Sequence, residues 1–135
     1  MKKLLSTKYS TSSFSAAMLI LRLGLGILML HHGYGKLTNF GSVQSKFMNF
    51  LGLGAKISLA LVVFAEFFCS IFLILGLFTR LSTIPLIITM CVALFKAHHA
   101  DFFGEGQVAA LYLTGYLVLL FVGPGRASID GMTGK

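Results

Sequence analysis

The sequence predicts an all-α membrane protein, a polytopic four-helix bundle. Of its 135 residues, 56% are hydrophobic and only 11% are charged, against roughly a quarter charged in soluble proteins. Mean hydropathy is +0.88. The apolar residues gather in four continuous runs rather than in alternating patterns, which disfavours a β-barrel. We expect membrane spans at residues 14–34, 55–78, 82–98 and 107–123.

The length of each apolar run and the residues that begin or end a helix justify each span in turn. The first two runs are long enough to cross a bilayer, and the last two need some flanking residues or tilt. Pro85 suits the first turn of the third span, where its missing N–H costs little. Gly123, Pro124 and Gly125 end the fourth span. The sequence thus predicts one domain over residues 14–124.

Polar tails at residues 1–13 and 125–135 flank this domain. The N-terminal tail is basic, like the start of a signal peptide. However, the apolar run that follows is too long and no small-residue cleavage site ends it. We therefore expect an uncleaved first helix.

The linker between the first two spans carries apolar residues at helical spacing with lysines between them. These residues are Phe40, Val43, Phe47, Phe50 and Leu51. The spacing predicts a short amphipathic helix that lies on the membrane surface.

Basic residues are more numerous at one end of the predicted bundle. One end holds Lys2, Lys3, Lys8, Arg80, Arg126 and Lys135, and the other holds Lys36, Lys46, Lys56 and Lys96. This excess favours both termini in the cytoplasm. The net charge of +7 belongs to the flanks of the spans, where lysines anchor to the lipid bilayer, and it does not indicate a nucleic-acid partner.

Two charged residues, Arg22 and Glu66, interrupt the first two spans. If these spans are antiparallel neighbours, both residues lie about equally far from the loop near Ser45. A lone charge at the bilayer centre costs at least ~2.5–3.5 kcal/mol, so such side chains face the bundle interior and find partners. We therefore expect an Arg22–Glu66 pair as the polar core. It is either a structural ion pair or the wall of a cavity that binds a ligand or relays protons or electrons.

All four histidines fall at one predicted end of the bundle. They are His31, His32, His98 and His99, and Asp101 and Glu105 lie at the same end. His32, Lys36 and His98 are candidates to bind a quinone headgroup through hydrogen bonds. The alternative is a set of interfacial histidines at the lipid headgroups. No His-x-x-Glu or His-x-x-x-His spacing is present, so we expect no metal site and disfavour haem.

Three further residues are ligand-binding candidates. Arg80 lies at the far end of the face that carries Glu66, and Tyr112 and Tyr116 share one face of the fourth span. The tyrosines either line a cavity or hydrogen-bond across helices. Cys69 and Cys91 are expected at similar depth, with two small buried side chains favoured over a disulfide.

An ordered set of motifs resembles a known family. The set comprises Arg22, His32, Gly33, Lys36, Glu66, Gly76, Leu77, Thr79, Arg80, His98 and Gly123 to Arg126. It resembles the DoxX family of small four-span bacterial membrane proteins, over residues 19–130. Many members carry a glutamate just before the fourth span, where this chain has Gln107 with Glu105 close by.

The resemblance implies a role in membrane redox chemistry. The family is named after a subunit of a thiosulfate:quinone oxidoreductase, and relatives are described as oxidoreductases or redox-complex subunits. It implies a quinone-interacting subunit of an inner-membrane oxidoreductase complex, with a redox partner subunit or a homo-oligomer. The chain has no obvious redox centre and no Walker motif or nucleophile elbow, which favours a subunit over a complete enzyme. The alternative is a non-enzymatic protein for lipid or small-molecule binding, transport or scaffolding.

Overall fold

The computed structural model describes residues 1–134, and all regular secondary structure in this range is helical. Three helical stretches are long and apolar enough to cross a membrane: Thr11–Thr38, Ala55–Leu75 and Thr79–Ala97. A shorter apolar helix covers Gln107–Val122. The all-α fold class and its four apolar helices are therefore confirmed.

The first long helix, α1 (Thr11–Thr38), begins at a hydroxyl cap. The Ser10 hydroxyl accepts the N–H of Ser13 at 3.0 Å, which satisfies one free donor of the first turn. Lys36 lies in the last turn, where a cation is favoured by the helix dipole.

The linker helix, α2 (Phe40–Gln44), is shorter than the predicted amphipathic helix. Phe47, Phe50 and Leu51 lie beyond its end in a non-helical segment. Leu51 and Gly52 have φ values of 55° and 74°, a left-handed conformation that a right-handed helix does not contain. Helical spacing alone did not reveal these turns.

The second span is one continuous helix that changes from α-helical to π-helical and back. It consists of α3 (Ala55–Val63), the π-helical segment η1 (Phe64–Cys69) and α4 (Ser70–Leu75). The span ends at Gly76 with φ of 69°, where Leu77 N–H donates to Phe72 O at 2.9 Å and Gly76 N–H to Leu73 O at 3.1 Å. This is a Schellman cap, and it needs a residue that tolerates positive φ.

The third span begins earlier than predicted. It comprises α5 (Thr79–Val92) and a second π-helical segment, η2 (Ala93–Ala97). Pro85 therefore lies inside α5 and not in its first turn, so that prediction is wrong. The helix extends further because Asp130, far along the chain, caps its first N–H groups. The chain continues through α6 (Gln107–Val122) and the short α7 (Ile129–Met132).

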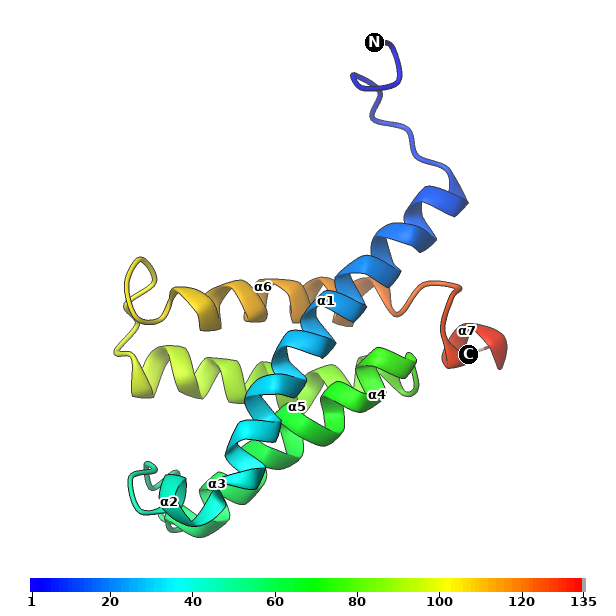
Figure 1. Ribbon diagram of the computed structural model, residues 1–135. Helices are drawn as coiled ribbons and strands as arrows, with labels where there is room; N and C mark the ends of the chain where they lie inside the picture. Colours follow the sequence, from blue (N-terminus) through cyan, green and yellow to red (C-terminus); the bar gives the residue numbers. More distant parts are fainter. Residues whose placement is uncertain (135) are drawn as a thin grey trace.

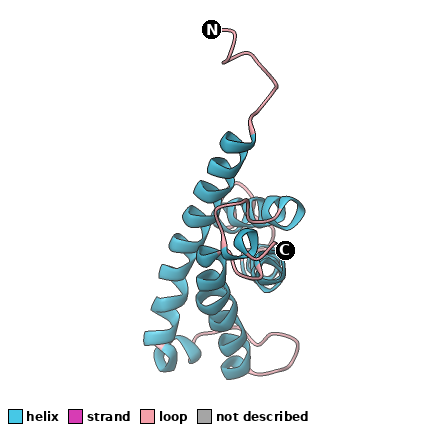
Figure 2. Ribbon diagram, turned by 90° about the vertical axis from the view of Figure 1, so that its right-hand side faces the viewer, coloured by secondary structure: helices cyan, strands magenta, loops and turns pink. Residues whose placement is uncertain are grey.

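The helices form two antiparallel pairs that cross obliquely (Figure 1). The second span lies along α1, as both views show, and α5 lies along α6 (Figure 2). The pairs meet mainly where α5 packs on η1 and where α1 contacts α6. The buried core at this crossing includes Met29, Leu73, Leu86, Leu94, Tyr116 and Leu119.

One close backbone approach sets the register of the first pair. A Cβ atom added to Gly33 would lie 2.6 Å from the carbonyl carbon of Glu66. Small residues permit such approaches between membrane helices. Gly33 of α1 is therefore level with Glu66, whereas Arg22 lies about 16 Å away along the α1 axis at 1.5 Å per residue.

Candidate functional site

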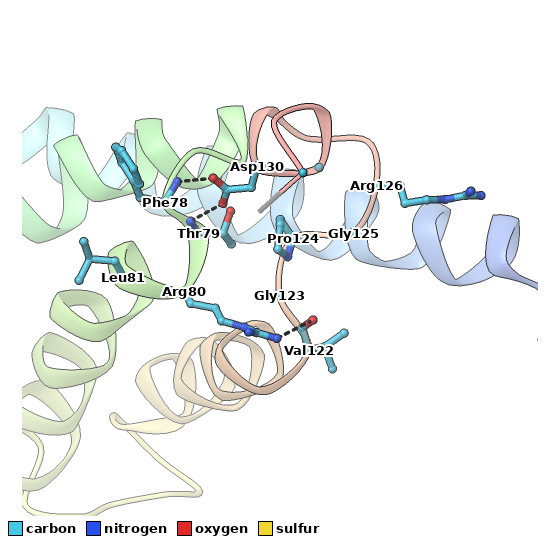
Figure 3. A pocket seen from close by; sticks show the side chains of 12 residues that line it. Phe78, Thr79, Arg80, Leu81, Val122, Gly123, Pro124, Gly125, Arg126 and Asp130 are labelled. Atoms are coloured by element: carbon cyan, nitrogen blue, oxygen red, sulfur yellow. Dashed lines mark hydrogen bonds between the residues drawn. The ribbon is translucent and has the colours of Figure 1, made fainter.

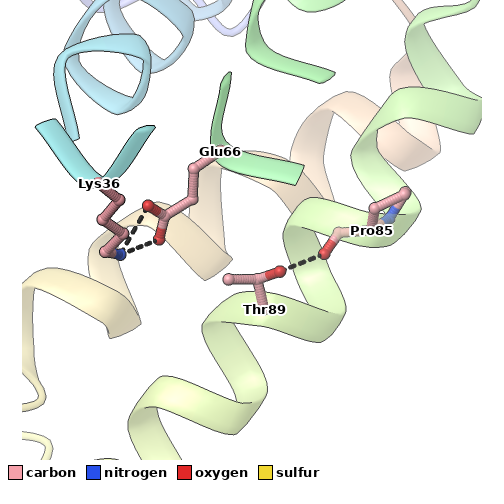
Figure 4. A network of polar contacts seen from close by, with 4 residues as sticks. All are labelled: Lys36, Glu66, Pro85 and Thr89. Atoms are coloured by element: carbon pink, nitrogen blue, oxygen red, sulfur yellow. Dashed lines mark hydrogen bonds and ion pairs between the residues drawn. The ribbon is translucent and has the colours of Figure 1, made fainter. Parts of the chain in front are cut away.

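The buried Glu66 forms an ion pair with Lys36, whose side chain is 30% exposed. The Lys36 ammonium donates to both carboxylate oxygens, at 2.7 Å to Oε1 and 2.6 Å to Oε2 (Figure 4). Glu66 is 3% exposed. The pair joins the last turn of α1 to η1, so each charge neutralises the other inside the bundle.

The predicted pairing of Arg22 with Glu66 is therefore wrong. Arg22 is 2% exposed and donates to Pro124 O and Ala127 O, both at 2.7 Å. The prediction assumed a symmetric loop between the spans. The close approach at Gly33 instead places Glu66 level with the C-terminal third of α1, whereas Arg22 lies near the middle of that helix.

Arg22 belongs to a cluster that holds the C-terminal segment on the bundle. The Asp130 carboxylate accepts Phe78 N–H at 2.9 Å and Thr79 N–H at 2.8 Å (Figure 3). Asp130 N–H donates to Gly76 O at 2.9 Å. The segment Gly123–Asp130, part of which was predicted as a polar tail, is thus bound to the ends of two spans.

Arg80 lies at this same end of the molecule, far from Glu66. Its guanidinium donates to Phe121 O and Val122 O, both at 3.3 Å, at the C-terminal end of α6. Figure 3 shows the bond to Val122. A cation in this position is favoured by the helix dipole. An open hollow of about 620 Å³ adjoins Arg80, Arg126 and Asp130.

A second cavity, of about 460 Å³, lies beside the Lys36–Glu66 pair. Its walls are mainly apolar and come from α3, η1, α5, η2 and the segment after α2. The lining residues are Lys36, Phe47, Met48, Phe50, Ser58, Leu61, Val62, Phe64, Ala65, Glu66, Pro85, Ile88, Thr89, Val92, Ala93, Ala97 and His98. The cavity thus combines a long apolar wall with a polar end.

The cavity opens sideways between two membrane spans. Leu61 and Phe64 on one side and Ile88 on the other line it, and each is about half exposed, at 50%, 49% and 54%. These helices are apolar spans, so the opening faces the lipid. A molecule dissolved in the bilayer can therefore reach the polar end without crossing water.

Both π-helical segments contribute to this cavity. Glu66 lies in η1, and His98 follows η2 directly, with its N–H donating to Ala93 O five residues back at 2.9 Å. π-Helical turns are rare and occur frequently at functional sites. No sequence signal identified them, because hydrophobic periodicity does not distinguish one extra residue in a turn.

Two of the predicted headgroup residues meet at the cavity, and one does not. Lys36 and His98 line it. His32 is exposed on α1, and its ring lies edge-on to Tyr112 at 6.1 Å. Tyr112 and Tyr116 stack at 6.0 Å in the bundle core, and neither lines this cavity.

A strap lies against the polar end of the cavity. We use this term for residues 45–54, between α2 and α3. The backbone N–H of Phe50 donates to the Ser58 hydroxyl at 2.9 Å, and Lys96 lies 5.2 Å from the centre of the Phe50 ring. Phe47 and Met48 of the strap also line the cavity. The strap thus covers part of the polar end of the cavity, where the side chains of Lys36 and His98 remain 30% and 35% exposed.

Among residues 1–134, no group of three or more His, Cys, Asp or Glu side chains is arranged to hold a metal ion. Both cysteines are free thiols, with Cys69 buried and Cys91 partly buried. The predicted disulfide alternative is thus absent from the structure. The polar chemistry of the cavity rests on an ammonium, a carboxylate and an imidazole.

Comparison with known proteins gives two matches. The family model described as DoxX matches residues 17–99, which include Arg22, Lys36, Glu66 and His98. The chain is also 28% identical over 123 residues to the "Inner membrane protein YqjF" of Escherichia coli (strain K12), covering 87% of this chain and 92% of that protein. No solved structure matches. Because the family model covers more than half of the sequence, this chain belongs to the DoxX family and is an integral membrane protein.

Proposed function

We propose that this protein binds a membrane-soluble quinone in the 460 Å³ cavity and serves as a quinone-interacting subunit of an inner-membrane oxidoreductase complex. The observation that carries the proposal is the Lys36–Glu66 pair, with its buried carboxylate, at the polar end of an apolar cavity that opens to lipid. Small-molecule sites commonly occupy ~300–1,000 Å³ and combine apolar walls with a few polar groups. The cavity has this size and composition.

The polar end can recognise both redox forms of a quinone ring. An ammonium has three N–H donors, and Glu66 takes two of those of Lys36. The third can donate to a quinone carbonyl. The Glu66 carboxylate can accept the hydroxyl proton of the hydroquinone. The apolar tail would lie between Leu61, Phe64 and Ile88, where the cavity opens to lipid.

The orientation in the membrane is part of the proposal. The end of the bundle that carries the chain termini holds Lys2, Lys3, Lys8, Arg80 and Arg126. The sequence also predicts Lys135 at this end, but it lies outside the described residues. The other end holds fewer basic residues, namely Lys36, Lys46, Lys56 and Lys96. By the positive-inside rule, the termini are cytoplasmic. The polar end of the cavity then faces the periplasm.

Mass spectrometry of extracted small molecules tests the ligand. The detergent-purified protein is compared with the Lys36→Met/Glu66→Met double variant, which removes both charges without stranding either. Lys56→Met is the matched control, because Lys56 is an exposed lysine near the same end that does not line the cavity. We expect quinone in the wild type and in the control, and its loss in the double variant.

Lipid binding is the second candidate function. It is favoured by the same sideways opening, which admits any amphiphile of suitable width. If wild type and double variant carry the same bulk phospholipid and no quinone, the quinone proposal is wrong. If wild type alone retains one phospholipid class, the protein handles lipid.

A further inference from the structure

We propose that His98 and Glu105 carry protons between the bound ligand and water at the end of the bundle opposite the termini. The inference rests on the proposed quinone site and adds a route to it. A quinone that cycles between its two forms takes up or releases protons as well as electrons. Groups at the polar end of the cavity that exchange protons with both the ring and water would provide such a route.

His98 lies between the cavity and the aqueous surface. Its ring lines the cavity, while its Nδ1 atom is buried and has no hydrogen-bond partner among the described residues. The nearest carboxylate oxygen, Oε2 of Glu105, lies 3.8 Å from Nδ1. The imidazole thus has one side toward the ligand and one nitrogen toward an acid group.

Glu105 connects His98 to water. Its side chain is 82% exposed, against 35% for His98. It lies in the loop before α6, where its backbone N–H donates to Asp101 Oδ2 at 3.3 Å. An exposed glutamate moves freely, so shortening 3.8 Å to hydrogen-bond distance needs only a small side-chain rotation.

The other charged and titratable groups on the surrounding elements either have contacts of their own or are exposed. These groups are Lys36, Glu66, Lys96, His99, Asp101 and Tyr112. Lys36 and Glu66 bind each other, Lys96 lies over Phe50, and Tyr112 packs in the core. Asp101 accepts the backbone N–H of Glu105, and His99 is exposed. Within residues 1–134, Glu105 forms the ion-pair contact of His98.

The proton step is a simple acid–base exchange. The ligand O–H bond breaks as a ring nitrogen of His98 gains the proton. The Nδ1–H proton then passes to the Glu105 carboxylate and on to water, and the reverse order delivers a proton. Imidazole suits both directions because one ring nitrogen can accept a proton while the other donates one. This step moves no electrons.

A coloured probe makes the proton step visible without a redox partner. The probe is a 2-hydroxy-3-alkyl-1,4-naphthoquinone, whose absorbance changes when its hydroxyl ionises. Full-length protein in lipid nanodiscs is loaded with probe and subjected to a stopped-flow pH jump, with empty nanodiscs subtracted. The rate of the colour change then reports proton exchange at the bound ring.

We expect His98→Ala to slow the colour change about ten-fold or more, since positioned acid–base groups accelerate proton transfer by larger factors still. Glu105→Gln should slow it about three-fold, because water replaces an exposed group in part. Added imidazole should restore the rate in His98→Ala and leave Glu105→Gln unchanged. His31→Ala is the matched control, because His31 is exposed on α1 and does not line the cavity.

Probe affinity separates this inference from the proposed function. If the variants bind the probe like wild type and exchange protons at the wild-type rate, the His98–Glu105 route is wrong and the quinone site stands. If imidazole fails to rescue a slow His98→Ala protein, His98 acts only structurally and the route is also wrong. If wild type binds no probe, both proposals fail.

Discussion

Lys36 and Glu66 neutralise each other at a depth where a lone charge is costly. Glu66 is expected in the bundle interior and Lys36 at one end of the first span, and the structure joins the two. The sequence did not predict this pair, because the depth of each charge in the membrane was inferred from its distance in residues to the connecting loop. The pair forms because the long side chain of Lys36 extends back toward η1, which the position of Lys36 in the sequence does not reveal.

Removal of Lys36 alone should strongly destabilise the protein. Lys36→Met leaves the buried Glu66 carboxylate without its partner, which costs about 3 kcal/mol or more in comparable cases. Lys36→Met/Glu66→Met should recover most of this loss. Denaturant unfolding in detergent, with Lys56→Met as the control, measures the difference. Equal stability of the single variant and wild type would contradict the assigned pair.

A double-mutant cycle distinguishes the observed pair from the expected one. Lys36 and Glu66 touch, so their substitutions should couple by at least about 1 kcal/mol. Arg22 and Glu66 lie near opposite ends of the α1 contact surface, so Arg22→Met and Glu66→Gln should be additive within about 0.5 kcal/mol. Strong coupling between Arg22 and Glu66 would mean that the register set at Gly33 is wrong.

At the level of elements, hydropathy predicted the four apolar helices but not how they wind or where they end. The helix α5 begins before its predicted start because Asp130 caps it from a distant part of the chain. The hydrophobic periodicity of the sequence did not indicate the two π-helical segments. Yet they carry Glu66 and place His98 at the cavity, so the functional detail lies where local patterns are least informative.

Gly33 tests the packing of α1 on η1. A methyl group there would collide with the Glu66 backbone, and such overpacking typically costs ~1–3 kcal/mol. Gly33→Ala should therefore destabilise the protein and disturb the cavity. Gly24→Ala is the matched control, because no atom lies within 4 Å of the added Cβ. Alanine also favours helix formation, so the control should be neutral or slightly stabilising in thermal unfolding.

Asp130 tests the attachment of the C-terminal segment. Asp130→Ala removes the acceptor of two N–H groups at the start of α5 and should cost about 1–2 kcal/mol, as other helix caps do. Residues 123–132 should then exchange amide hydrogens faster. Hydrogen-exchange mass spectrometry measures this, and Asp101→Ala, in the loop at the opposite end, serves as the control. Unchanged exchange in Asp130→Ala would show that the segment is held by other contacts.

At the level of the whole molecule, the two ends of the bundle differ in chemistry. One end is basic and closed by Arg22, Asp130 and the segment they hold. The other end has the strap, the ion pair and the His98–Glu105 contact. The sequence predicted this division from the positions of its lysines and histidines. The sideways opening was beyond prediction, because it depends on how the two helix pairs cross.

The orientation of these ends decides which compartment exchanges protons with the cavity. The orientation is measured in a protein whose Cys69 and Cys91 are replaced by alanine. A single cysteine is then introduced at Ser6 or at Ser45, which are both exposed and lie at opposite ends. The reagent is a maleimide that crosses the outer membrane but not the inner membrane. By the positive-inside rule, it should label Ser45→Cys in intact cells. It should label Ser6→Cys only after the inner membrane is permeabilised. The reverse pattern would place the termini outside and make the His98–Glu105 route open to the cytoplasm.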